Sequence, residues 1–135
     1  MTAPPIRGVH HLKVPVRDLQ RSRDWYERVL GLSVGREFTD DDGVVRGVAG
    51  GLVDPAGQTV LSLALRVDPA HSSGTGGFDP LSLAIGSFDD LAAWQHHLSA
   101  EGVDTSTIAD GDDVRAIAVR DPDQVEIRLF AARSE

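Results

Sequence analysis

The two halves of this chain carry a repeat, and the repeat constrains the fold more than any other feature of the sequence. The segment DPAGQTVLSL at 54–63 matches DPDQVEIRL at 121–129 when one residue is dropped, and VPV at 14–16 falls on LAI at 83–85. Similarity at a fixed spacing is typical of a duplicated structural unit. An internal duplication is the simplest explanation, so each half should fold into the same order of elements.

The first half changes its hydrophobic period along the chain. Leu12, Val14 and Val16 alternate with other residues, which predicts a half-buried strand. The next segment has helical spacing, with Asp18 placed to cap its start and Gly31 suited to the left-handed position after its last turn. Strand-like runs follow, separated by the turn signals DDG and DPAG, at 32–38, 44–53 and 59–67. The predicted order is β-α-β-β-β.

The second half repeats this order. LSLAIG at 81–86 is typical of a strand, and Ser87 with Asp90 resembles a capping box that opens a helix ending at Gly102. Further strands are predicted at 105–109, 114–120 and 125–130. The pattern predicts an α+β fold in one domain over 1–135, made of two tandem βαβββ modules at about 7–67 and 79–131 with a Gly/Ser-rich linker at 71–80.

Composition excludes several classes of partner. With 13 Lys and Arg against 21 Asp and Glu, the net charge of −8 repels nucleic-acid phosphates and anionic lipid. No apolar run is long enough for a membrane span, and the start MTAPPIRG lacks the apolar core of a secretion signal, so a cytoplasmic location is expected. The absence of cysteine excludes disulfides, thiolate metal sites and a cysteine nucleophile.

Strand alternation sorts the side chains into two faces. The face expected to pack beneath the helices consists of Leu12, Val14, Val16, Leu61, Leu63, Leu65, Leu81, Leu83, Ile85, Val125, Ile127 and Leu129. The opposite face mixes small residues with polar, charged and aromatic ones, namely His11, Lys13, Ser62, Ser82, Glu126, Arg128 and Phe130. From the pattern alone this second face is either exposed to solvent or the lining of a polar pocket.

Three segments carry a resemblance to a known family. His11, the pattern V-x-D-L-x-x-S-x-x-W-Y-x-x-V-L-G-L from Val16 to Leu32, and DPDQVEIRLF at 121–130 resemble the vicinal oxygen chelate superfamily. That group includes glyoxalase I, extradiol dioxygenases, and the fosfomycin and bleomycin resistance proteins. The resemblance implies a cupped mixed β-sheet with helices on its convex face, an active site on the concave face, and paired modules within one chain or across a homodimer.

The resemblance also implies where a metal would bind. In metal-dependent members, the first and last strands of each module supply ligands, and these positions fall on His11, Ser62, Pro80 and Arg128. Only His11 has a donor of the expected kind, and a guanidinium repels a divalent cation. His10 is expected on the opposite face from His11, His71 in the linker, and His96 and His97 on the second helix. We therefore expect no metal and no other cofactor.

Three functions stay open on this sequence. The first is a metal-independent binding protein that holds a small molecule in the cup, with an anion favoured because Arg128, Lys13 and His11 would make the cup positive. Alternatively, Arg128 simply pairs with Glu126 or another nearby carboxylate. The second function is a metal-dependent lyase, isomerase or dioxygenase that uses unexpected donors. The third is a metal-free enzyme with His11 as acid or base and Arg128 as an anion clamp.

Overall fold

A computed structural model describes residues 2–68 and 79–134 and confirms the predicted fold class. The first module contains β1 (Leu12–Val16), α1 (Leu19–Leu30), β2 (Ser33–Thr39), β3 (Val45–Val53) and β4 (Thr59–Val67). The second contains β5 (Leu81–Gly86), α2 (Phe88–Ala100), β6 (Ser106–Asp110), β7 (Val114–Arg120) and β8 (Glu126–Ala132). The predicted linker at 71–80, including His71, lies outside the described residues except for its last two positions.

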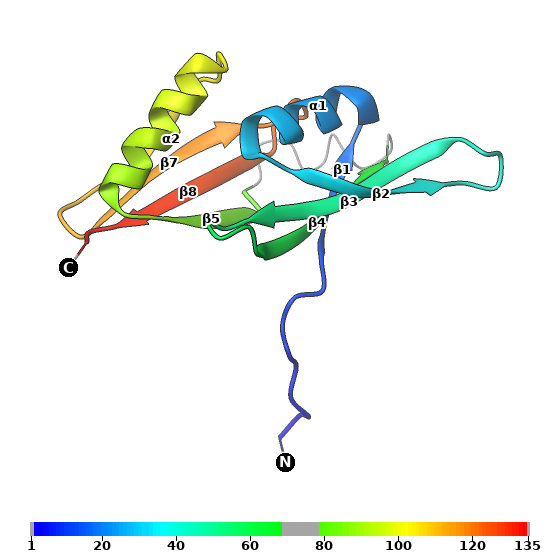
Figure 1. The fold of residues 1–135 in the computed structure, drawn as a ribbon, viewed down its shortest axis with the longest axis horizontal. Coiled ribbons are helices and arrows are strands. Elements are labelled where there is room, and N and C mark those ends of the chain that lie inside the picture. Colours follow the sequence, from blue (N-terminus) through cyan, green and yellow to red (C-terminus); the bar gives the residue numbers. More distant parts are fainter. Residues whose placement is uncertain (1, 69–78, 135) are drawn as a thin grey trace.

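Each module forms one mixed four-stranded sheet. The strand orders are β1-β4-β3-β2 and β5-β8-β7-β6, so the two sheets have the same topology. In each sheet the first and last strands of the module pair in parallel, and the remaining pairs are antiparallel. Both helices lie on one side of the sheets, and the N-terminal residues project from the other side (Figure 1). No helix in the described parts of the chain is long and apolar enough to span a membrane.

The helix boundaries follow the predicted capping residues. The Asp18 side chain accepts a hydrogen bond from the Arg21 amide at 3.1 Å, and Gly31 ends α1 in the left-handed region with φ of 74°. At α2, Ser87 and Asp90 form both hydrogen bonds of a capping box. Hydrogen bonds from Ser87 hold the pKa of the Asp90 carboxyl below its ordinary value. These caps satisfy amides that a helix start would otherwise leave unpaired.

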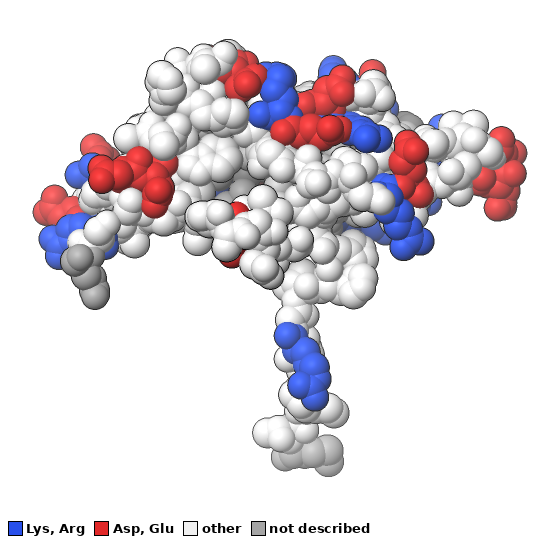
Figure 2. Space-filling model, in the orientation of Figure 1, with Lys and Arg blue, Asp and Glu red and all other residues white. Residues whose placement is uncertain are grey.

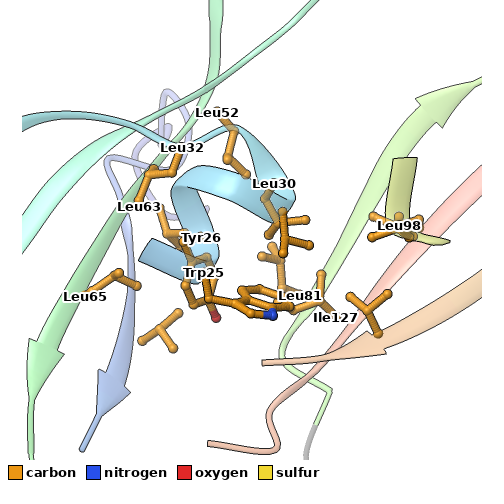
Figure 3. Packing of buried hydrophobic residues seen from close by; sticks show 14 of the residues in the cluster. Trp25, Tyr26, Leu30, Leu32, Leu52, Leu63, Leu65, Leu81, Leu98 and Ile127 are labelled. Carbon is orange, nitrogen blue, oxygen red and sulfur yellow. The ribbon is translucent and has the colours of Figure 1, made fainter. Parts of the chain in front are cut away.

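One hydrophobic core joins the two modules through α1. Trp25, Tyr26, Val29 and Leu30 are buried on this helix. Figure 3 shows the Trp25 ring beside Leu81 and Ile127, which come from β5 and β8 of the second module. Every residue predicted on the helix-covered face is buried or partly buried. The apolar alternation therefore identified the core correctly.

Polar contacts also cross between the modules beside α1. The Tyr26 hydroxyl donates to the Asp121 carboxylate at 2.7 Å, and that carboxylate also accepts from the amides of Asp123 and Val125 at 2.9 Å. Burial raises the pKa of Asp121, although these hydrogen bonds oppose the shift. His97 Nε2 lies 2.9 Å from the Val29 carbonyl oxygen. The DPDQ segment at 121–124 thus connects the second module to α1.

Candidate functional site

A cavity of about 810 Å³ lies on the face of the first sheet opposite α1, and we call it the first-sheet cavity. The strands contribute its floor, and the residues just before β1 contribute one side. The lining residues are Val9, His10, His11, Lys13, Gly35, Arg36, Phe38, Ala49, Gly50, Ser62, Ala64, Leu65 and Arg66. Three residues of the predicted polar face, His11, Lys13 and Ser62, therefore lie at one site.

The placement of His10 corrects the sequence prediction. His10 and His11 both line the cavity, and their Nδ1 atoms are 2.9 Å apart. Alternation failed here because β1 begins at Leu12, so neither histidine belongs to a strand. In a hydrogen bond of this kind one Nδ1 donates and the other accepts. If the donating ring is neutral, its Nε2 is free of a proton and can accept one.

Small residues make the floor of the cavity. Ala64 on β4 pairs with Ala49 on β3, and both contribute to the lining. Gly50 turns towards the other face, where an added Cβ would overlap the backbone of Ser33 on β2, so a side chain does not fit at this position. The backbones of β2 and β3 therefore approach closely. The floor of the cavity therefore lies close to the strand backbones, and longer side chains surround it.

The charged side chains of the cavity are all basic. Lys13, Arg36 and Arg66 line it, and no lining residue in the described parts of the chain carries a carboxylate. None of these three cations forms an ion pair with a described residue. The Arg36 guanidinium lies over the Phe38 ring, 4.7 Å from its centroid. Within a protein of net charge −8, this site is locally positive.

The remaining predicted site residues lie on the second sheet. Ser82, Glu126, Arg128 and Phe130 belong to β5 and β8, and none of them lines the first-sheet cavity. Arg128 Nε lies 2.7 Å from a Glu126 carboxylate oxygen and 3.2 Å from one of Asp79. The hydrogen bond to Glu126 raises the pKa of the Arg128 guanidinium. The sequence left two interpretations of Arg128, an anion-binding group or a partner of nearby carboxylates. Its contacts within one chain are those of the second.

The donors present do not fit a divalent metal. Three of the four positions implied by the family resemblance lack a suitable ligand. Ser62 offers a hydroxyl, Pro80 has no side-chain donor, and Arg128 is a cation paired with Glu126. Among the described residues, His11 has one other histidine in contact, His10. The described residues contain no group of three or more His, Cys, Asp or Glu side chains arranged to hold an ion. A catalytic site needs about three protein ligands with an open position.

Arg36, Phe38 and Arg66 were missed by sequence reasoning. Arg66 shares the alternation of Ser62 and Ala64 on β4, so this residue could have been found by extending the pattern. The side chains of β2 were harder to assign, because the pairing register with β3 shifts between Val34 and Arg36. Such an irregularity changes which side chains point to each face. The sequence contains no clear sign of it besides Gly35.

A second cavity, of about 490 Å³, lies where the ends of α1 and α2 approach β7. Arg28, Arg120, Glu101 and Glu126 are among its lining residues, so charges of both signs are present. Arg28 and Glu101 form an ion pair at 2.7 Å. Arg120 and Glu126 also pair, at 3.6 Å, so this cavity lacks the one-sided charge of the first-sheet cavity.

Comparisons with known proteins agree with this architecture. Residues 8–129 match the model of the Glyoxalase/Bleomycin resistance protein/Dioxygenase superfamily, and the chain belongs to that superfamily. No curated protein matches the sequence. Among solved structures, TnmS3, an antibiotic binding protein from Streptomyces sp. CB03234, is similar, with a TM-score of 0.73 at 25% identity over 96% of this chain and 99% of that one.

Two further structures show the same fold at lower identity. The fosfomycin resistance protein FosX from Listeria monocytogenes has a TM-score of 0.74 at 16% identity, over 95% of both chains. A glyoxylase/bleomycin resistance protein/dioxygenase domain from Frankia sp. EAN1pec has a TM-score of 0.71 at 24% identity, over 96% of this chain and all of that one. The structures that share this fold thus include an antibiotic binding protein and a fosfomycin resistance protein.

Proposed function

We propose that this protein binds a small anionic molecule in the first-sheet cavity without a metal. One observation carries the proposal: Lys13, Arg36 and Arg66 line a single cavity without a carboxylate among its described lining residues. Like charges on one sheet face repel one another unless a counter-ion lies between them. A carboxylate or phosphate on a ligand would supply that counter-charge, and arginine can bind either group through two parallel hydrogen bonds.

The donor set supports the metal-independent part of this proposal. Elemental analysis of protein purified without chelator should detect no stoichiometric zinc, nickel, iron or manganese, and dialysis against these ions followed by desalting should leave none bound. Retention of one equivalent of any of them, lost in His11→Ala, would contradict the proposal and favour the metal-dependent lyase, isomerase or dioxygenase alternative.

The family membership and the antibiotic-binding relative support a role in sequestering a small molecule. A thermal-shift screen of carboxylates, phosphates and phosphonates, followed by calorimetry, tests this role. Lys13→Met and Arg66→Gln should each weaken binding about tenfold, the effect of losing one charge-assisted hydrogen bond. Arg133→Gln is the matched control, because this exposed arginine pairs with Asp113 outside the cavity. Binding that is unchanged in both cavity variants would refute the assignment.

A metal-free enzyme is the second candidate, and the His10–His11 contact favours it. A neutral donating ring in this pair leaves Nε2 able to accept a proton at the mouth of a positive cavity. Incubating a bound carboxylate in D₂O and following its NMR spectrum tests for proton abstraction. Exchange that is lost in His11→Ala but retained in His96→Ala, at an exposed position of α2, would establish catalysis. The absence of exchange leaves binding as the function.

We also propose that the working unit is a homodimer, which the family resemblance implies. The polar faces of the two sheets carry separate groups of predicted site residues, with His11, Lys13 and Ser62 on the first and Arg128 on the second. Pairing of a first module with a second module from another copy would bring the two groups to one cup. Sedimentation equilibrium tests this, and a monomer at all micromolar concentrations would refute it.

A further inference from the structure

The three cations of the first-sheet cavity lie towards opposite edges of the sheet, with Lys13 and Arg66 on β1 and β4 and Arg36 on β2. From this arrangement we infer that the ligand is a dianion with its negative groups at two ends, one held by Lys13 with Arg66 and the other by Arg36. The inference rests on the proposed function and adds the charge pattern of the ligand. It depends on the strand register, on the pairing of nearby carboxylates and on the floor between the two places.

The register puts Lys13 and Arg36 at opposite ends of one row. Lys13 on β1 pairs with Ala64 on β4, Ala64 pairs with Ala49 on β3, and Ala49 pairs with Arg36 on β2. The row therefore crosses three strand-to-strand spacings, or about 14 Å between the two outer backbones. The backbones that carry the two cations are thus separated by several times the width of a single carboxylate.

Arg66 lies at the Lys13 end of the row. It pairs with Pro15, two residues beyond Lys13 on β1, and so stands diagonally across from Lys13. The Cα atoms of two such diagonal neighbours are typically about 7–8 Å apart. Both side chains line the cavity, and neither has an ion-pair partner in the described parts of the chain. Two unpaired cations this close form a site for one anionic group.

Arg36 forms the second place. Its guanidinium is positioned against the Phe38 ring, while the neighbouring Glu37 pairs with Arg23 of α1 on the other side of the sheet, 3.6 Å away. The nearest acidic residue in sequence is thus turned away from the cavity. Its cation–π contact limits the positions of the guanidinium without neutralising its charge.

The floor between the two places has no large side chain. Ala49 and Ala64 occupy the two middle positions of the row, and both carry only a methyl group. A chain or ring connecting two anionic groups can therefore lie along the row and contact the floor. This surface is apolar, so the connecting part of the ligand is expected to be uncharged.

Binding of matched mono- and dicarboxylates tests the inference. Linear α,ω-dicarboxylates from succinate to sebacate are titrated by calorimetry next to the n-alkanoates of equal length, at fixed ionic strength. We expect the best diacid to bind at least about tenfold tighter than its monoacid, because it gains a second charge-assisted contact. Affinity should also pass through an optimum with chain length.

Variants assign the second charge to its partner. Arg36→Gln should reduce the best diacid to about the affinity of the matched monoacid and weaken the monoacid much less than the diacid, whereas Lys13→Met should weaken both. Arg36→Lys, which keeps the charge, should restore part of the diacid preference. Arg133→Gln is again the control, and thermal melting of every variant checks that the fold is intact.

The outcomes separate the two proposals. Equal affinity for monoacids and diacids, with both dependent on Lys13, would overturn the dianion inference and leave the anion-binding function standing. A diacid preference that survives Arg36→Gln would overturn the inference as well. Binding of neither series at millimolar concentration would count against the proposed function itself, and against the dianion with it.

Discussion

Tyr26 and Asp121 show how a single pair of residues joins the modules. The hydroxyl donates at 2.7 Å to a carboxylate that is almost fully buried, and the two residues are 95 positions apart in sequence. Burial and the neighbouring carboxylate raise the pKa of the Tyr26 hydroxyl, so it stays protonated as a donor at all ordinary pH values. The contact therefore links α1 of the first module to the turn before β8.

Replacing this donor should destabilise the whole chain. Tyr26→Phe keeps the ring and leaves one Asp121 oxygen without its hydroxyl donor, at a cost of about 1–3 kcal/mol in the free energy of unfolding. Urea denaturation measures this loss. Asp121→Asn is the matched variant, because the amide can still accept from the Asp123 and Val125 amides and donate to Tyr26. Equal stability of Tyr26→Phe and wild type would show that the contact contributes nothing.

The raised pKa of Asp121 predicts a pH dependence. Between the ordinary value of 3.8 and the higher folded value, the folded chain binds a proton that the unfolded chain has lost, so stability from this group falls as pH rises. Above the folded pKa, the full cost of burying the carboxylate is present. The stability of Asp121→Asn minus that of wild type should thus grow from pH 4 towards neutral, measured by urea midpoints across that range. A difference independent of pH would contradict the assignment.

At the level of elements, the sequence predicted most of what local chemistry determines. Asp18, Gly31 and Ser87 marked helix boundaries because capping depends on neighbouring residues alone. The cavity was harder to predict because it depends on pairing between distant strands. Arg36 could not be assigned a face across the register shift in β2, and His10 lies before the strand to which alternation was applied.

The end of α1 gives a test of this local chemistry. Gly31→Ala places a Cβ at φ of 74°, in open space, so the cost comes from backbone strain alone and should be about 1 kcal/mol. Gly35→Ala is the control, because that position is equally open and has no positive φ. Thermal melting should show a lower midpoint for the first variant only. Equal midpoints would mean that the left-handed cap adds nothing to stability.

At the scale of the whole molecule, charge is distributed unevenly. Figure 2 shows acidic and basic side chains interspersed above α1 and an acidic tip on the β2–β3 hairpin, where Asp40, Asp41 and Asp42 lie. Asp40 pairs with Arg46 at 2.8 Å, and the hydrogen bond lowers the pKa of the Asp40 carboxyl. This hairpin tip thus adds to the net negative charge, while the cations of the first-sheet cavity form no ion pair with a described residue.

This contrast between paired and unpaired cations predicts unequal effects on binding. Arg66 has no ion-pair partner among the described residues, whereas Arg128 is neutralised by Glu126 and Asp79. Arg66→Gln should therefore weaken binding of the best anion about tenfold, and Arg128→Gln by less than about threefold, even when a second copy completes the cup. Calorimetry above and below the dimer dissociation constant separates the two states. A larger loss for Arg128→Gln, seen only in the dimer, would mean that assembly breaks its pairing and makes the second sheet part of the binding site.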